Sequence, residues 1–389
     1  MPATIVSSAD GPDTVYFMEV SILKEKLTHF FSSRWGIISA GCFIGIFGAL
    51  LSVWGNPENM GICVACFERD IAGALGLHRA AAVQYIRPEI PGFVLGSMAA
   101  ALMFGEFKSR SGSAPAVRFV LGFFAMIGAL AFLGCPWRAL LRLAGGDLNA
   151  VIGFAGLAAG ITVGVQFLKA GYTLGRARED RAASGLIMPV FMIVLLLLLV
   201  FGFPALLRSE KGPGALNAPV IVSLAIALGV GFLAQRTRFC TMGAIRDVVL
   251  IRDTHLLSGI TALLVSAFAV NLILGRVTFG FALQPVAHSN HLWNFLGMAL
   301  AGLAFSLAGG CPGRQLFLSG EGDGDATVFV FGMIIGAAFA HNFGFAAKPD
   351  TIAAGSLQTG GISPFGMAAV IIGIIVCLIF GFAMKEKNV

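Results

Sequence analysis

The chain has 389 residues, of which 57% are hydrophobic and only 12% are charged, and its mean hydropathy is +0.87. This composition is typical of a polytopic membrane protein and excludes an ordinary soluble domain. The net charge of +6 does not indicate nucleic-acid binding, because no basic domain lies outside the apolar segments. The sequence contains no GxxxxGK[ST] phosphate loop, so we expect no ATP hydrolysis within this chain.

The chain opens with a polar segment and continues with regularly spaced apolar runs. Residues 1–15 lack the basic and apolar regions of a signal peptide, and residues 15–34 have the pattern of an interfacial amphipathic helix. The apolar runs that follow are each long enough to cross roughly 30 Å of hydrocarbon, and they predict about ten spans. The predicted spans are residues 35–53, 83–105, 117–134, 149–169, 186–206, 217–234, 256–275, 291–309, 326–345 and 363–383.

The clearest boundary in the chain is the loop 207–216, which contains Gly212-Pro213-Gly214 and so has the composition of a turn. We therefore divide the chain into five parts. These are an N-terminal cytoplasmic or interfacial segment (1–34), a first repeat with a linking helix (35–206), a linker (207–216), a second repeat (217–345), and a C-terminal loop with the final span (346–389).

Basic residues are unevenly distributed between the loops. If both termini are cytoplasmic, most of the 26 lysines and arginines fall in segments that face the cytoplasm. The positive-inside rule then predicts a multi-pass protein of the bacterial inner membrane with its N-terminus and C-terminus inside.

One motif occurs twice in the same register. Gly134-Cys135-Pro136-Trp137-Arg138 is matched 176 residues later by Gly310-Cys311-Pro312-Gly313-Arg314. Five predicted spans separate each feature from its match, and an odd number of spans inverts the second copy. The sequence therefore predicts an all-α polytopic membrane protein built from two inverted-topology repeats, an arrangement typical of transporters. Further matched pairs are Cys63 with Cys240, Arg69-Asp70 with Arg246-Asp247, Asp147 with Asp323, and Gln166 with Asn342.

The duplicated motif predicts a short, re-entrant helix in each repeat. An apolar span ends at the glycine, and Pro136 or Pro312 suits the first position of a new helix. Cys135 and Cys311 are then expected close to the N-caps, where free N–H groups and partial positive charge favour an anion. A helix that breaks at membrane depth is tolerated where it is buried in protein or lines a cavity.

Arginines follow the cysteines in both repeats and are expected to attract an anion. Charged groups inside a membrane cost about 2.5–3.5 kcal/mol on insertion scales, so they need a structural or functional reason. The alternative interpretation is a proline kink with a space-filling cysteine, in which the arginine pairs with Asp147 or Asp323. The duplication favours the functional interpretation. The four arginines are Arg69, Arg138, Arg246 and Arg314.

Cys63 and Cys240 are candidates for the same pathway because they precede the matched arginine-aspartate pairs. Cys63-x-x-Cys66 also has the spacing of a zinc ligand pair or a redox dithiol. The second copy has Gly243 where Cys66 would fall, so we expect no metal, and Cys66 is an additional pathway candidate.

Two glycine pairs, Gly156-x-x-x-Gly160 and Gly332-x-x-x-Gly336, predict close helix contacts between the copies. Gln166 and Asn342 follow on the same spans. Each is expected either to point its amide into the pathway or to form a hydrogen bond with a neighbouring helix.

Four other residues are interpreted as structural or solvated. His288 and His291 lie in one outer loop without the spacing of metal ligands, and we expect water around them. Cys42 and Cys377 lie in apolar spans without charged neighbours and are expected to be small buried hydrophobes.

Together these motifs resemble the YeeE/YedE sulphur-transport family over roughly residues 35–345. The stretch Asn59-Met60-Gly61-Ile62-Cys63-Val64-Ala65-Cys66-Phe67 is similar to the YedE branch, described as proposed selenium transporters. The resemblance implies an inner-membrane uptake protein for thiosulfate or a related sulphur or selenium anion. No sulphur-carrier domain is fused to the chain, so such a partner would be a separate small protein on the cytoplasmic side.

The resemblance also implies a mechanism, a relay of cysteine thiols at an hourglass constriction. Cys135 and Cys311 match the two central cysteines and are expected to form a pair there. Cys63 and Cys240 are then expected as the outer and inner stations. Trp137, which stands where the second copy has a glycine, is expected to narrow the outer path or alter selectivity.

The first hypothesis is therefore transport of a thiosulfate-like sulphur or selenium anion without net covalent chemistry or a cofactor. One alternative is a membrane thiol oxidoreductase that uses Cys63 and Cys66, and another is a general small-anion channel with incidental cysteines. The duplicated single cysteines favour transport, because an oxidoreductase needs thiols that can approach each other. The expected partners are the anion and membrane lipids, and not nucleic acid.

Overall fold

The computed structural model describes residues 24–353 and 355–385. In this part of the chain, ten long helices coincide with the ten predicted spans. By length and composition, eight helical segments are able to cross a membrane, and the two shorter of the ten helices are Glu89–Phe104 and Ile187–Phe201. The prediction of an all-α polytopic membrane protein is confirmed. The long helices are α2 (Arg34–Val53), α4 (Glu89–Phe104), α5 (Pro115–Phe132), α7 (Asn149–Lys169), α9 (Ile187–Phe201), α10 (Val220–Arg236), α12 (His255–Ile273), α13 (His291–Ala308), α15 (Gly324–Asn342) and α16 (Pro364–Ala383).

The predicted interfacial helix at 15–34 lies partly outside the described residues, which begin at 24. Residues 24–32 are helical and lead directly into α2. Ser33 separates the two helices and acts as the N-cap of α2, because its Oγ accepts a hydrogen bond from the backbone N–H of Gly36 (3.2 Å).

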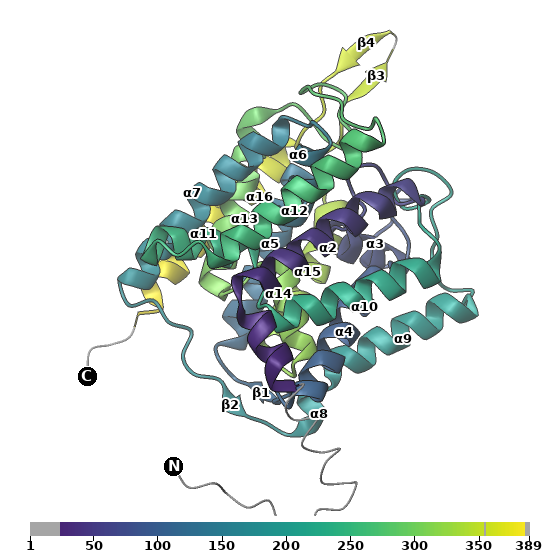
Figure 1. Ribbon diagram of the computed structural model, residues 1–389. Coiled ribbons are helices and arrows are strands. Elements are labelled where there is room, and N and C mark those ends of the chain that lie inside the picture. Colours follow the sequence, from purple (N-terminus) through teal and green to yellow (C-terminus); the bar gives the residue numbers. More distant parts are fainter. Residues whose placement is uncertain (1–23, 354, 386–389) are drawn as a thin grey trace, which may run out of the picture.

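The loops gather at two opposite ends of the bundle, which we call the β1 end and the β3 end (Figure 1). At the β1 end, β1 (Arg110–Ser111) pairs with β2 (Arg178–Glu179). At the β3 end, β3 (Thr351–Ala353) and β4 (Ser356–Gln358) form a projecting antiparallel hairpin. Because successive long helices join loops of opposite ends, the start of α2 and the end of α16 both lie at the β1 end.

Helices of the first repeat pack mainly against helices of the second repeat. α2 packs against α12 and α4 against α10, while α7 packs against α13 and α15 against α5. In the sequence match, α2 corresponds to α10, α4 to α12, α5 to α13 and α7 to α15. Exchanging each helix for its match leaves this set of contacts unchanged, as expected of two repeats related by a pseudo-twofold axis.

The two glycine pairs lie in the contacts between repeats. A Cβ added to Gly156 or Gly160 would lie 2.1 or 2.0 Å from a backbone carbonyl oxygen of α13. Gly332 and Gly336 meet α5 in the same way, at 2.3 and 2.6 Å. The predicted close packing between the copies is therefore observed, because only glycine lets these backbones approach so closely.

Four short helices fill the interior of the bundle: α3 (Val64–Ala74), α6 (Pro136–Ala144), α11 (Thr241–Ile251) and α14 (Pro312–Gly320). A fifth, α8 (Ala182–Gly185), precedes α9. The C-terminus of α6 reaches the β3 end, where Thr278 N–H donates to the Gly145 carbonyl (2.9 Å). The C-terminus of α14 reaches the β1 end, where Lys108 N–H donates to the Glu321 carbonyl (3.0 Å). The matched helices thus enter from opposite ends, which is the inverted arrangement.

The glycine contact between α7 and α13 gives a stability prediction. Gly160→Leu forces a side chain into the backbone of α13, and overpacking of this kind costs about 1–3 kcal/mol. Val163→Leu is a matched control on the same helix, because Val163 is 41% exposed on the bundle surface. We expect thermal unfolding in detergent to show a lower Tm for Gly160→Leu and an unchanged Tm for Val163→Leu. Equal Tm values for the two variants would contradict the packing.

Candidate functional site

Cys135 and Cys311 occupy the N-cap positions of α6 and α14. Both helices start at the predicted prolines, Pro136 and Pro312. Neither cysteine forms a side-chain capping hydrogen bond, so no side chain caps the first N–H groups of these helices. Each helix therefore presents unsatisfied donors and its positive dipole end to the interior of the bundle.

Cys63 and Cys240 are also N-caps, which the sequence did not reveal. The Cys63 Sγ accepts a hydrogen bond from the Cys66 N–H (3.3 Å) and caps α3. The Cys240 Sγ accepts one from the Gly243 N–H (3.3 Å) and caps α11. The signal that was missed is the apolar helix that follows each cysteine after a break, because cysteine is not a usual capping residue.

The four cysteines form two buried thiol pairs, one in each repeat. The Sγ atoms of Cys63 and Cys135 are 3.8 Å apart, and those of Cys240 and Cys311 are 3.6 Å apart. The exposed fractions of these four residues do not exceed 5%, and all four are free thiols. This differs from the expected central pair of Cys135 with Cys311. Each thiol instead finds its partner within its own repeat, where two short helices converge.

The first thiol pair lies beside a buried arginine. The Arg138 side chain donates to the carbonyl oxygens of Leu133, Pro285 and Val286 and to the Sγ of Cys66 (3.8 Å). Among the described residues no carboxylate lies within 4.0 Å of it. The guanidinium therefore leaves a positive charge next to the first pair that no carboxylate offsets.

The second thiol pair has a neutralised arginine. Arg314 binds the carboxylate of Glu321 (3.0 Å), which also binds Arg238 (3.1 Å). The first repeat has Gly145 at the position that matches Glu321. The two matched arginines thus differ in that, among the described residues, only Arg314 contacts a carboxylate.

The alternative interpretation, in which these arginines pair with Asp147 and Asp323, is not observed for either. Asp147 is fully buried and binds Arg142 (2.6 Å). Asp323 binds Arg110 (2.8 Å) and caps α15, accepting from the Ala326 N–H (2.9 Å). Both aspartates therefore hold the turns that follow the short helices, and they leave Arg138 and Arg314 free for other partners.

Arg69 and Arg246 each bind the aspartate that follows them. Arg69 and Asp70 are buried and 2.7 Å apart, and Arg87 adds a second contact to Asp70 (2.8 Å). Arg246 binds Asp247 at 2.8 Å, and its side chain is one-third exposed. Sequence comparison of the repeats missed Arg87 because it has no matched copy.

The structure bears on the expectations for four polar side chains and corrects the one for His288. The Asn342 amide donates to the Leu77 carbonyl (2.9 Å) and is exposed, so it joins a neighbouring segment and does not point into the pathway. Gln166 is also exposed. His288 is fully buried, not solvated, with its Nε2 2.8 Å from the Ala131 carbonyl oxygen, while His291 is exposed as expected. His288 was expected to be solvated because it lies in a loop, but the loop 274–290 folds back on α5 and buries it.

Cys377 is fully buried, as expected, and Cys42 is half-buried. Neither belongs to a thiol pair within the described residues. Cys42 and Cys377 therefore serve as internal controls for the four cysteines of the thiol pairs.

Glu68 was also missed by the sequence comparison. It lies on α3 and is fully buried, and neither carboxyl oxygen has a hydrogen-bond partner among the described residues. The matched residue is Ile245, so a search for repeated residues passes over it. A buried carboxyl group without partners is costly, and only its uncharged form is tolerated easily.

Trp137 lies where the N-termini of α6 and α14 meet. It is 1% exposed, and its ring centroid is 6.0 Å from Phe93, 5.6 Å from Phe239 and 5.9 Å from Phe317. A Cβ added to Gly313 would lie 3.1 Å from Cζ2 of Trp137. The indole therefore occupies the space that the matched glycine leaves open.

A cavity at the β3 end approaches the first thiol pair. Its volume is about 380 Å³, and its lining includes Arg69, His341, Lys348 and Leu133, with no Asp or Glu. The Leu133 carbonyl oxygen accepts hydrogen bonds from Arg138 and from Cys66 (3.9 Å). A single peptide group thus separates this cationic cavity from the first site.

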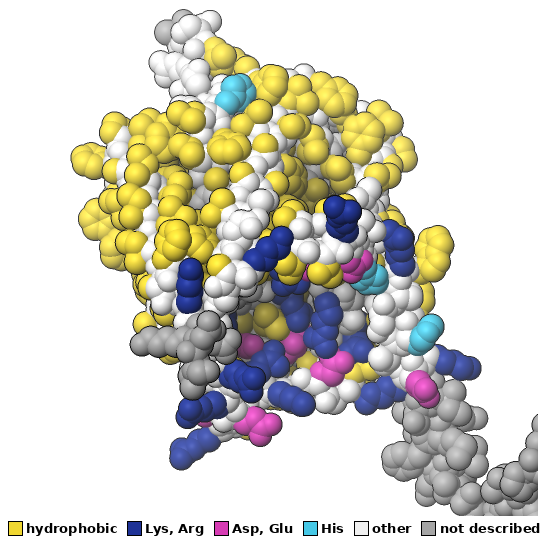
Figure 2. All heavy atoms as spheres, turned by 90° about the vertical axis from the view of Figure 1, so that its left-hand side faces the viewer, with side chains coloured by type: hydrophobic (Ala, Val, Ile, Leu, Met, Phe, Trp, Pro, Cys, Tyr) yellow, Lys and Arg dark blue, Asp and Glu magenta, His cyan; other side chains and the backbone are white. Residues whose placement is uncertain are grey.

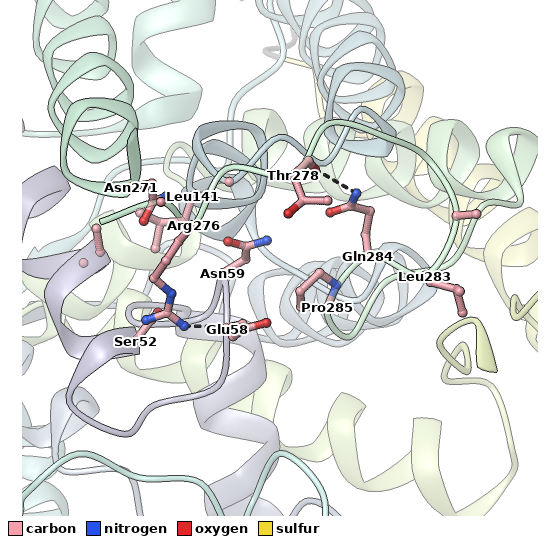
Figure 3. A pocket seen from close by; sticks show the side chains of 15 residues that line it. Ser52, Glu58, Asn59, Leu141, Asn271, Arg276, Thr278, Leu283, Gln284 and Pro285 are labelled. Atoms are coloured by element: carbon pink, nitrogen blue, oxygen red, sulfur yellow. Dashed lines mark hydrogen bonds and ion pairs between the residues drawn. The ribbon is translucent and has the colours of Figure 1, made fainter. Parts of the chain in front are cut away.

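A second cavity of about 440 Å³ lies at the same end (Figure 3). Asn59 and Pro285 line it, and their carbonyl oxygens accept hydrogen bonds from Arg138. Arg276 points toward Glu58, and the two form an ion pair of 2.9 Å. The carboxylate makes this cavity less suited to an anion.

An ion-pair network surrounds the second site at the β1 end. Glu106 binds Arg236 and Arg238, each at 2.8 Å. Burial raises the pKa of Glu106, but the hydrogen bonds from Arg236 and Gln235 and the charge of Arg238 bring it below its ordinary value. Figure 2 shows a hollow toward this end, below a hydrophobic band, in which Lys, Arg, Asp and Glu side chains gather.

The thiol pairing predicts which disulfides form on oxidation. Copper-phenanthroline treatment of the purified protein should link Cys63 to Cys135 and Cys240 to Cys311, because each pair needs only a small approach to reach bonding distance. Mass spectrometry of the digested protein identifies the linked peptides. A link between Cys135 and Cys311 as the main product would contradict the pairing.

Asp147 and Asp323, which follow the short helices α6 and α14, should contribute differently to the free energy of unfolding. Asp147→Ala leaves Arg142 buried without its carboxylate and is expected to cost about 3–5 kcal/mol. Asp323→Ala removes an N-cap and a partly exposed ion pair and should cost only about 1–2 kcal/mol. Denaturant unfolding of both variants in detergent measures the difference. Equal losses would show that burial does not set the strength of these pairs.

Residues 236–388 match the family model described as sulphur transport. This stretch contains α11 and α14 and therefore the second thiol pair. No curated protein matches the chain significantly, and the family match does not distinguish a selenium branch. The resemblance inferred from the motifs is confirmed over residues 236–388, the part of the chain that matches the sulphur-transport family model.

Proposed function

We propose that the protein takes up a thiosulfate-like sulphur or selenium anion across the bacterial inner membrane, passing it from the first thiol pair to the second. One observation carries the proposal: each repeat brings two helix N-termini together at a pair of buried thiols. The family match supports the general class of cargo.

The thiol pairs suit an anion that must leave its hydration shell. An unpaired charge inside the membrane is very costly. Each helix N-terminus offers N–H donors and a dipole that stabilises an anion by about 0.3–1 kcal/mol, and up to about 2 kcal/mol when buried. Thiols add weak donors. Moderate attraction at two successive sites permits entry and also release.

The two sites differ in the partners of their matched arginines. Arg138 has no carboxylate partner among the described residues, while Arg314 is bound to Glu321. The first site therefore attracts an anion more strongly, and the second holds it less tightly. If the β1 end is cytoplasmic, as the distribution of basic residues predicts, this gradient suits capture outside and release inside.

The cationic cavity at the β3 end is the entrance that fits this pathway. Lys348 gives it a positive charge, while Asp70 offsets the charge of Arg69, and Leu133 connects it to Arg138 and Cys66. In the second cavity at this end Glu58 offsets the charge of Arg276, so this ion pair offers no net positive charge to an anion.

Dithiol redox chemistry is the second candidate, and one observation favours it. Sequence reasoning held that single cysteines argue against an oxidoreductase, but the thiols approach each other to 3.8 and 3.6 Å. The pairs that approach are Cys63 with Cys135 and Cys240 with Cys311, and not Cys63 with Cys66 as that alternative assumed.

Serine substitution separates transport from redox turnover. Serine is a strong N-cap, so Cys135→Ser or Cys311→Ser lets a hydroxyl bind the N–H groups that the anion needs. We expect each variant to lower uptake of labelled thiosulfate into proteoliposomes at least about tenfold, which corresponds to about 1.4 kcal/mol. Cys42→Ser and Cys377→Ser are the matched controls and should transport normally.

The same vesicles identify the cargo when thiosulfate, selenite and selenosulfate are compared side by side. Unchanged uptake in both Cys135→Ser and Cys311→Ser would reject the thiol relay and leave a general anion channel. Thiol oxidation that turns over with an added quinone, without net uptake, would support the oxidoreductase instead.

A further inference from the structure

Trp137 separates the two thiol pairs. It follows Cys135 by two residues, and its ring packs on Gly313 and Phe239. Gly313 lies two residues after Cys311, and Phe239 directly precedes Cys240. An anion that moves from the first pair to the second therefore meets the indole on the way.

The indole N–H is an unused hydrogen-bond donor. Trp137 is 1% exposed, and its Nε1 has no acceptor within hydrogen-bonding distance among the described residues. Buried tryptophans usually satisfy this group, and an unsatisfied donor is costly. Phenylalanine would fill the pocket of Phe93, Phe239 and Phe317 without this penalty.

We propose that Trp137 forms a third anion site between the two thiol pairs, as the barrier that closes the pathway at rest and as the hydrogen-bond donor to the anion when it passes. The ligand class is a small oxyanion with a terminal chalcogen, such as thiosulfate. This inference rests on the proposed function and adds to it a residue that only the first repeat contains.

The surroundings fit both parts of this role. Phe93, Phe239 and Phe317 surround the indole and exclude water and hydrated ions. The N–H edge of the indole packs directly on Gly313, where an added Cβ would lie 3.1 Å from Cζ2 and 3.6 Å from Nε1. Displacement of the indole from Gly313 then opens the path and exposes the N–H to the anion, where a charge-assisted hydrogen bond replaces a donor that had no partner.

Two substitutions separate the donor from the barrier. Trp137→Phe keeps an aromatic ring but removes the N–H, so thiosulfate uptake should fall about tenfold while the vesicles stay tight to chloride. Trp137→Gly reproduces the residue of the second repeat and should let chloride leak through. Phe93→Leu alters the same aromatic pocket without touching a donor, and we expect it to change uptake less than Trp137→Phe.

A spectroscopic measurement tests the donor directly. In a chain with Trp35, Trp54 and Trp293 changed to Phe, the emission of Trp137 reports on its N–H environment. Thiosulfate at saturating concentration should shift or quench this emission, and chloride at the same ionic strength should not. Thermal unfolding checks that each variant is folded.

The outcomes are decisive either way. Trp137→Phe with normal uptake, or emission that thiosulfate leaves unchanged while the same chain transports it, would overturn the third site. Absence of thiosulfate uptake by the unaltered protein would reject the proposed function, and it would be recognised before any Trp137 variant is compared.

Discussion

Backbone N–H groups at the start of a helix cannot be left in hydrocarbon, and this constraint underlies the rest of the structure. Four short helices begin in the interior of the bundle, each at a cysteine. Irregular backbone at membrane depth is tolerated only where protein or a cavity surrounds it. The long helices must therefore enclose the short ones closely, and the glycine contacts of α7 with α13 and of α5 with α15 allow them to do so. The same N–H groups that impose the enclosure are the donors that an anion needs.

The duplication supplies the scaffold, and the departures from symmetry supply the differences between the two sites. Where the first repeat has Cys66, Leu133 and Trp137, the second has glycines. Larger side chains thus stand at the first site where glycines stand at the second, and the Trp137 ring fills the space beside Gly313. The matched arginines also differ, because among the described residues Arg314 has a carboxylate partner and Arg138 has none. A symmetric pair of sites would bind equally from both ends, whereas these two differ in both access and attraction.

The sequence predicted what depends on local pattern and on repetition. Apolar runs predicted all ten long helices, and the two prolines predicted where α6 and α14 start. The partners of buried side chains were not predictable in this way. Cys135 meets Cys63, and Asp147 meets Arg142, because helices distant in the chain converge, and a single sequence carries no direct signal of that convergence. Glu68 and Arg87 were overlooked for a different reason: the search followed matched residues, and both occur in one repeat only.

The interlocked repeats have a consequence for how the protein is made. The closest partner of α5 is α15, and that of α2 is α12, so the first half of the chain enters the bilayer before the surfaces that complete it exist. Membrane insertion and helix association are separable steps, and here the order of synthesis separates them in time. Until α15 emerges from the ribosome, the glycine-lined faces of the early helices contact lipid. The early helices are therefore inserted before they can pack, and the helix bundle forms only once the last third of the polypeptide has been inserted.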